Sequence, residues 1–158
     1  MPKTYGPVRV KHPRRFALVL AVAALFSASS ASALDYRSIA DAAAAYDAPS
    51  AKAKPLFVLL AGTPVELVVS LEGWSKVRDS KGDMVWVEKK HLADKRTVIV
   101  RADRVQVRAA ADEKAALVFE AERDVVLDLL EAAPGGWIKV RHRDGQSGFL
   151  KAPQAWGF

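Results

Sequence analysis

Gly-Trp-Ser-Lys-Val-Arg at positions 73–78 returns as Gly-Trp-Ile-Lys-Val-Arg at positions 136–141, sixty-three residues later. At the same spacing Gly82 matches Gly145, and Trp86 matches Phe149. The match continues upstream with a small shift that is absorbed in a loop: residues 64–68 correspond to 125–130, and residues 45–49 correspond to 106–110. Such self-similarity indicates two copies of the same structural unit. We therefore predict a tandem duplication that covers nearly all of the chain after residue 33.

Each copy has the composition of short strands separated by turns. Val65, Leu67 and Val69 alternate with other residues, as the inward-facing side of a strand does. Glycine-containing hairpin sequences follow at 79–83 and 143–146, and the second contains the Asp-Gly pair that favours tight β-turns. Several short strands within about 60 residues predict a small closed barrel, which removes exposed sheet edges. The predicted fold class is all-β, with two small β-barrels in tandem.

The domain boundaries follow from the repeat. We place the first barrel at 34–96 and the second at 97–158, joined by a short charged linker at 93–97. Residues 34–45 contain four consecutive alanines, and residues 112–117 are also rich in helix-forming side chains. These two stretches are compatible with a turn or two of helix, in a lead-in segment and in a long first loop, but the predicted fold does not require it.

Residues 1–33 have the three parts of a secretory signal peptide: a basic start, an apolar run at 16–26, and small residues ending in Ala33. We expect export by the Sec route to the periplasm or the exterior, with cleavage after Ala33. The apolar run is short for a bilayer span, which needs about 20 residues. We expect no stable membrane span after cleavage; the alternative is a signal that is retained as an anchor. The chain has no cysteine, so it is not a lipoprotein.

The net charge of +6 belongs almost entirely to this N-terminal segment, which holds five basic residues and no acidic one. The remaining 125 residues carry 19 basic and 18 acidic side chains. A body so close to neutral lacks the basic surface that phosphate backbones require, so no nucleic acid partner is expected.

The order of the motifs resembles the bacterial SH3-like (SH3b) family. The second copy has the family's Val-Gln-Val-Arg opening at 105–108, the Gly-Trp-Ile-Lys-Val core at 136–140 and the Gly-Phe-Leu closing strand at 148–150. The first copy departs from the pattern at 46–49 and at Val85, where the family prefers glycine. The resemblance implies two SH3-like β-barrels, in an exported protein that binds cell-wall material or other proteins.

The strand pleat places Trp74, Lys76 and Arg78 on one face, with Ser75 and Val77 on the other. The second copy repeats this pattern, and Val77, Ile138 and Val140 are expected in the core. An aromatic groove is the device by which SH3-type domains hold extended peptides. The candidate ligand-binding residues are Tyr46, Trp74, Lys76, Arg78, Trp86, Trp137, Lys139, Arg141 and Phe149. The alternative is that these rings, with Trp156 and Phe158, complete the small cores.

No catalytic site, metal site or cofactor is expected. The three histidines do not have ligand spacing, and no serine lies in a nucleophile motif. Three functions remain: a module that binds peptidoglycan stem peptides, an adaptor that binds an envelope protein, and a structural spacer. All three are non-enzymatic.

Overall fold

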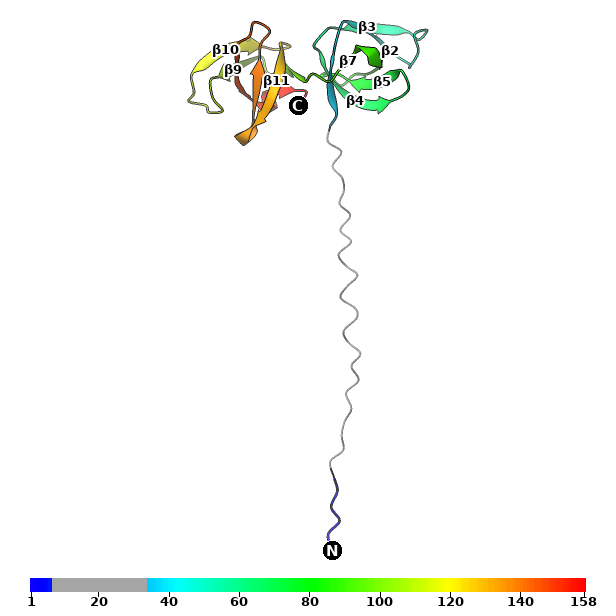
Figure 1. The fold of residues 1–158 in the computed structure, drawn as a ribbon, viewed down its shortest axis with the longest axis vertical. Helices are drawn as coiled ribbons and strands as arrows, with labels where there is room; N and C mark the ends of the chain where they lie inside the picture. The colour runs from blue at the N-terminus through cyan, green and yellow to red at the C-terminus, as the bar shows by residue number, and fades with distance from the viewer. Residues whose placement is uncertain (7–33) are drawn as a thin grey trace. The chain divides into compact units, whose positions relative to one another are not determined.

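The computed structural model describes residues 1–6 and 34–158, so the predicted signal peptide lies almost entirely outside the described residues. Residues 34–158 belong to one compact unit that contains two antiparallel sheets, each closed into a small barrel (Figure 1). No α-helix occurs among the residues described; the helical elements are three short 3₁₀ turns. The predicted all-β fold is confirmed.

The first barrel contains seven strands in the order β3-β2-β6-β5-β4-β1-β7. The elements are β1 (Tyr36–Ile39), β2 (Ala43–Tyr46), β3 (Pro55–Leu59), β4 (Pro64–Ser70), β5 (Trp74–Arg78), β6 (Met84–Glu88), η1 (Lys89–His91) and β7 (Leu92–Ala93). The second barrel repeats this order as β10-β9-β13-β12-β11-β8-β14. Its elements are β8 (Thr97–Val100), β9 (Arg104–Arg108), β10 (Leu117–Glu122), β11 (Val126–Ala133), η2 (Pro134–Gly136), β12 (Trp137–Arg141), β13 (Ser147–Lys151), η3 (Ala152–Gln154) and β14 (Ala155–Trp156).

Neither of the two stretches that are compatible with helix is helical. Tyr36–Ile39 and Ala43–Tyr46 are strands, and residues 112–116 form turns before β10 begins. Of the four alanines, Ala43 and Ala45 are buried, and they belong to the first core together with Val85. Barrel packing here overrides the helix propensity of alanine, which is a weak preference per residue.

Pairing within the barrels also corrects two details of the repeat. Tyr46 pairs with Trp86, and Arg108 pairs with Phe149, so Tyr46 corresponds to Arg108 and not to Val107. The predicted alternation of Val65, Leu67 and Val69 ends at a β-bulge between Leu67 and Val69, which leaves Val69 exposed. A bulge adds one residue to one strand and so reverses the side to which the following side chains point.

At one pair of equivalent positions, the two cores have the large and the small side chain on opposite strands. In the second barrel, a Cβ placed on Gly148 would lie 2.5 Å from the Arg108 carbonyl oxygen and 2.8 Å from Val107 Cγ1. The corresponding pair in the first barrel is Val85 with Ala45, and both of these residues are buried. The large side chain stands on β9 in one copy and on β6 in the other, which explains the missing glycine in the first.

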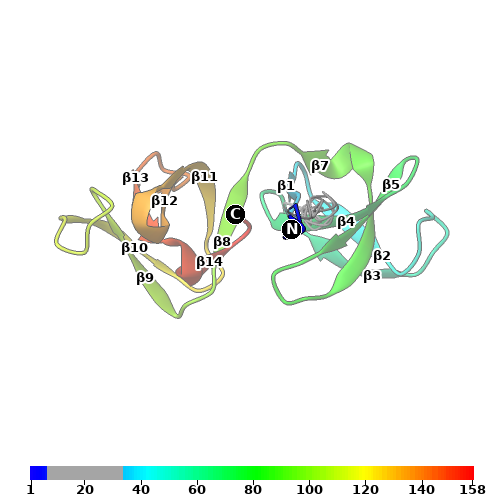
Figure 2. The same ribbon diagram turned by 90° about the horizontal axis from the view of Figure 1, so that it is seen from below.

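The barrels meet through the linker and the last strand. The Arg96 guanidinium lies 5.4 Å from the centre of the Tyr36 ring and donates a hydrogen bond of 3.0 Å to the Gly157 carbonyl. Trp156 meets Tyr36 edge-on at 5.1 Å, and Thr97 Oγ1 donates to the Gly62 carbonyl at 2.7 Å. Figure 2 shows β8 and β14 on the side of the second barrel that faces the first. Trp156 therefore packs at this junction, whereas Phe158 is exposed.

We expect Gly148→Val to destabilise the protein by about 1–3 kcal/mol, because the new side chain crowds both the Arg108 carbonyl oxygen and the Val107 side chain. The double variant Gly148→Val/Val107→Ala has the small and large side chains of the first barrel. Its loss of unfolding free energy should therefore be smaller than the sum of the losses in the two single variants. A coupling of about 0.5–3 kcal/mol is expected for residues in contact. Urea unfolding of the four proteins in this cycle measures it, and strictly additive values would contradict the size exchange.

We expect Arg96→Ala to lower the free energy of unfolding by about 1–3 kcal/mol, since it removes a partly buried cation–π contact and a charged hydrogen bond. Arg101→Ala is the matched control, because Arg101 is exposed and its side chain makes no hydrogen bond to another described residue. The urea midpoint is the measurement. Equal midpoints for the two variants would show that Arg96 does not stabilise the junction.

Candidate functional site

The predicted face of the first barrel is a compact aromatic cluster. Trp74, Lys76 and Arg78 are half-buried on the outer side of β5, while Ser75 and Val77 are buried, as the pleat predicts. Lys76 pairs across the sheet with Trp86 and holds its Nζ 6.0 Å from the ring centre. Tyr46 meets Trp74 edge-on at 5.5 Å. The structure therefore brings together Tyr46, Trp74, Lys76 and Trp86.

Arg78 is on the same face of β5, but its guanidinium contacts Glu66 and not the aromatic cluster. Its guanidinium pairs with Glu66 at 3.1 Å, and the Glu66 side chain is itself nearly buried. The corresponding pair in the second barrel is Arg141 with Asp128, at 3.2 Å. Both arginines are thus engaged in ion pairs across neighbouring strands.

The second barrel replaces the aromatic cluster with two cation–ring contacts. Lys139 Nζ lies 5.6 Å from the centre of the Phe149 ring. Lys151 pairs with Trp137 across β12 and β13, and its Nζ lies 5.7 Å from that ring. Trp137 is only 9% exposed, so most of its ring belongs to the wall of the barrel. Where the first barrel has Tyr46, the second has Arg108.

A groove of about 520 Å³ opens beside Trp137. Of the nine candidate residues, Trp137 is the one that lines it. The other lining residues come from β9, from the loop before β10, from β10 itself, and from the end of β13 through η3: Arg104, Gln106, Arg108, Glu113, Glu120, Lys151 and Gln154. Alternation in the sequence indicates part of this wall. Val105 and Val107 alternate with Arg104, Gln106 and Arg108, and since the two valines are buried, the other three side chains point outward.

Opposite charges alternate along the groove. Arg104 lies 3.6 Å from Glu120, and Gln106 Nε2 donates to the same carboxylate at 3.4 Å. Arg108 donates to the Ala115 carbonyl at 2.8 Å. Lys151 pairs with Glu113, and this hydrogen bond holds the pKa of the Glu113 carboxyl below its usual range. The groove thus offers donors and acceptors in succession next to an aromatic edge, which suits an extended peptide with charged groups of both signs.

The matching surface of the first barrel has a different chemistry. The pair Gln106 and Glu120 corresponds to Ala44 and Val58, since each pair lies opposite across the equivalent strands. β3 ends the strand order of its sheet, and its residues Leu56, Phe57 and Val58 are all exposed. The polar pair that borders the groove of the second barrel is therefore replaced by an apolar pair in the first.

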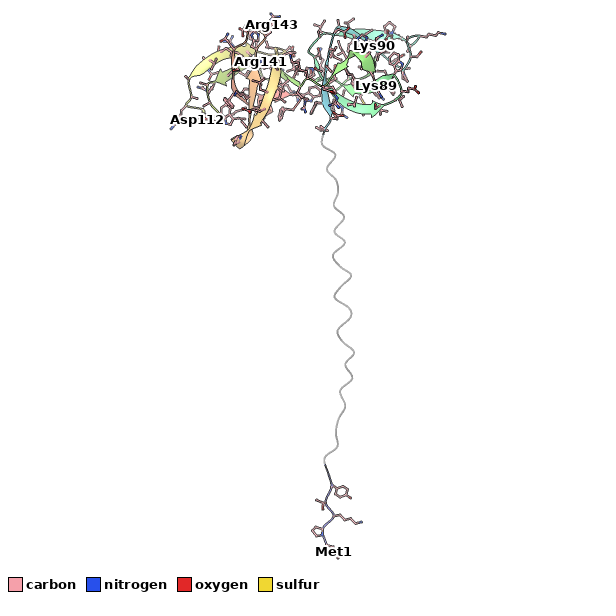
Figure 3. All side chains as sticks on the ribbon, in the orientation of Figure 1. Met1, Lys89, Lys90, Asp112, Arg141 and Arg143 are labelled. Atoms are coloured by element: carbon pink, nitrogen blue, oxygen red, sulfur yellow. The ribbon has the colours of Figure 1, made fainter. Side chains whose placement is uncertain are left out.

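Figure 3 places Lys89 and Lys90 on the first barrel, and Arg141 and Arg143 on the second. Within residues 1–6 and 34–158, no group of three or more histidine, aspartate or glutamate side chains is arranged to hold a metal ion. No helix in the same part of the chain is long and apolar enough to cross a membrane.

The family model of the bacterial SH3 domain matches the sequence twice, at residues 40–94 and 101–157. No curated protein matches it. Among solved structures, NlpC2 from Trichomonas vaginalis is similar at 11% identity and a TM-score of 0.36, over 78% of this chain and 48% of that one. A NlpC/P60 family protein from Bacillus cereus is similar at 17% identity and a TM-score of 0.36, over 77% and 56% of the two chains. The chain thus spans about half the length of the structures it matches.

We expect the indole N–H resonance of Trp137 to shift as acid is added. The midpoint of this titration should lie below 4.5, the usual pKa of glutamate. The pKa of Glu113 is lowered, so its ion pair with Lys151 is intact above that range and is lost as the pH falls through the lowered value. Lys151 then moves off the ring. Two-dimensional ¹H–¹⁵N NMR measures the shift, and Glu113→Gln should abolish it. An unchanged titration in that variant would mean that another group is responsible.

Proposed function

Because the chain belongs to the bacterial SH3 domain family through both of its barrels, we propose that it is a non-enzymatic binding module of the bacterial cell envelope. Export by the N-terminal segment, to the periplasm or the exterior, is part of this proposal. The ligand we propose is the peptide portion of peptidoglycan, held by the groove beside Trp137.

The alternation of charges in this groove is the observation that carries the proposal. Peptidoglycan stem peptides are short, extended, and bear free carboxylates as well as amino groups. On binding, Arg104, Arg108 and Lys151 would exchange their present partners for the carboxylates of the ligand, and Glu113 and Glu120 would then accept from its amino groups. Trp137 adds an apolar edge on which a small side chain can rest.

One site per chain is expected, not two. The first barrel has Ala44 and Val58 at the positions of Gln106 and Glu120, and Glu88 at the position of Lys151. A ligand chosen by charge in the second barrel finds no equivalent partners in the first. The first barrel then serves to position the second, to which it is fixed at the junction.

A pull-down on insoluble sacculi tests this proposal. We expect the purified protein to be retained at low and at physiological salt, and Lys151→Met to weaken its affinity at least about tenfold, or ~1.4 kcal/mol. Lys151 is exposed, so this change spares the core, which Trp137→Ala would not.

Lys139→Met is the matched control for that experiment. It also removes a lysine that lies over an aromatic ring, but Lys139 does not line the groove. Its retention should equal that of the unmodified protein. If the unmodified protein stays in the supernatant, or if both variants bind equally well, the groove is not a wall-binding site.

A second candidate function is an adaptor for another envelope protein, and the exposed apolar edge of β3 favours it. An extended segment of a partner can add to such an edge as one more strand. In that case sacculi do not retain the protein, and Phe57→Lys blocks capture of the partner while Lys151→Met leaves it unchanged.

A further inference from the structure

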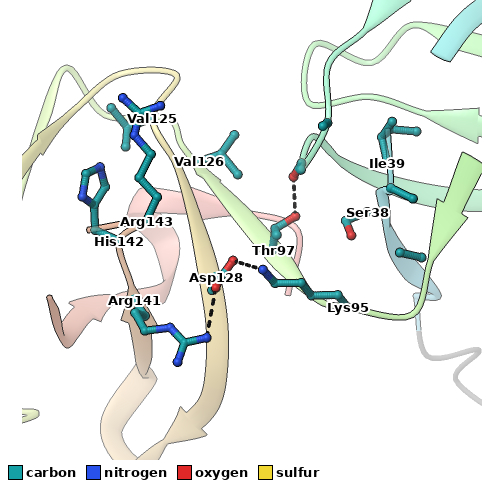
Figure 4. A pocket seen from close by; sticks show the side chains of 14 residues that line it. Ser38, Ile39, Lys95, Thr97, Val125, Val126, Asp128, Arg141, His142 and Arg143 are labelled. Carbon is teal, nitrogen blue, oxygen red and sulfur yellow. Dashed lines mark hydrogen bonds and ion pairs between the residues drawn. The ribbon is translucent and has the colours of Figure 1, made fainter. Parts of the chain in front are cut away.

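A second hollow lies where the two barrels meet, and it is separate from the groove beside Trp137. It has a volume of about 630 Å³, within the usual range for small-ligand sites. Figure 4 shows Ser38 and Ile39 of the first barrel on one side, Val125, Val126 and Arg143 of the second barrel on the other, and Lys95 of the linker reaching in between. Both walls belong to one compact unit.

The charges in this cavity are unequal. Lys95, Arg141 and Arg143 are cationic, and Asp128 is the one carboxylate that lines it. Asp128 is already shared: Lys95 Nζ lies 2.7 Å from one oxygen, and the Arg141 guanidinium lies 3.2 Å from the other. Burial opposes ionisation of this carboxyl, but the hydrogen bonds from Lys95 and Arg141 outweigh it and hold its pKa below the usual range.

Arg143 is the cation that remains. Its side chain makes no ion pair or hydrogen bond with any other residue that the structure describes, and it lines the cavity beside Val125. Of the eight other arginines in the barrels, seven contact a carboxylate or a carbonyl oxygen: Arg37, Arg78, Arg96, Arg104, Arg108, Arg123 and Arg141. A planar guanidinium left free at the mouth of a cavity is matched in shape and charge by one carboxylate.

The first barrel has no counterpart of this arrangement. The hairpin position of Arg143 is occupied there by Ser80, and the position of His142 is occupied by Asp79. Asp79 turns its carboxylate inward and accepts hydrogen bonds from the backbone N–H groups of Lys81 and Asp83, both at 2.9 Å. The first barrel therefore has no arginine at the hairpin position from which Arg143 lines the cavity.

We propose that this cavity binds the free C-terminal carboxylate of a short peptide with small aliphatic side chains. Arg143 pairs with the carboxylate, and Ile39, Val125 and Val126 contact the aliphatic groups. The Ser38 hydroxyl and neighbouring backbone groups lie at the same wall for hydrogen bonding. One charge is preferred over two, because Lys95 and Arg141 are neutralised by Asp128 and because that carboxylate repels further negative charge.

This site does not rest on the groove beside Trp137, and the two can be separated by experiment. We would titrate the ¹⁵N-labelled protein with N-acetyl-alanyl-alanine and follow the backbone amides. Signals of Val126 and Thr97 should shift, whereas those of Gln106 and Lys151 in the groove should not. The C-terminal amide of the same peptide should bind at least tenfold more weakly, because it lacks the charge.

Two further arms complete the test. Arg143→Gln should weaken the acid at least tenfold and leave the weak binding of the amide unchanged; Arg101→Gln, which alters another exposed arginine, should bind like the unmodified protein. Sodium acetate should bind at least tenfold more weakly than the peptide acid. Equal binding of acid and amide, equal binding of acetate, or an Arg143→Gln variant that binds normally would each overturn the proposal. Retention on sacculi, which depends on Lys151, is not affected by any of these results.

Discussion

The Arg96 guanidinium is the interaction on which the arrangement of the two barrels depends. It lies against the Tyr36 ring of the first barrel and donates to the Gly157 carbonyl of the second, while its own carbonyl accepts from the Leu129 N–H. Burial raises the pKa of the Tyr36 hydroxyl, so this ring stays neutral beside the cation at physiological pH. The linker residue thus ties three segments that are far apart in the sequence, and it is this that gives the cavity two fixed walls.

The two copies share one backbone fold but differ in their surface residues. The strand order is identical in both copies, and one buried pair has exchanged its large and small side chains, as Ala45 and Val85 stand against Val107 and Gly148. Close-packed interiors tolerate such exchanges when the total volume is kept. Outward positions carry no such constraint. Glu120 on β10 stands where β3 has Val58, and Gln106 on β9 stands where β2 has Ala44, so two barrels of one fold present different surfaces to a ligand.

The sequence was sufficient for the fold because the repeat, the alternation on β5 and β12, and the glycine hairpins all report local geometry. It was less informative about the site. Aromatic residues drew attention to β5, β6, β12 and β13, but the groove is built largely from β9 and β10, whose outward side chains are ordinary polar residues. The cavity with Arg143 could not be predicted from the sequence, because it is formed by residues of both barrels where they meet. The strand at Ala43 and Ala45 was also not evident from the sequence. Their strand conformation comes from packing in the core and not from the intrinsic preference of alanine.

The position of β14 in the chain has a consequence for the order of assembly. Each barrel is closed by its own last strand, β7 on β1 and β14 on β8. The first barrel therefore has all of its strands once residue 93 has emerged during synthesis or translocation. The second must wait for residues 155–156, and the contacts of Trp156 and Gly157 with Tyr36 and Arg96 come at the same moment. Closure of the second barrel and docking of the two barrels are thus a single late event, and a chain interrupted shortly before residue 155 would lose both at once.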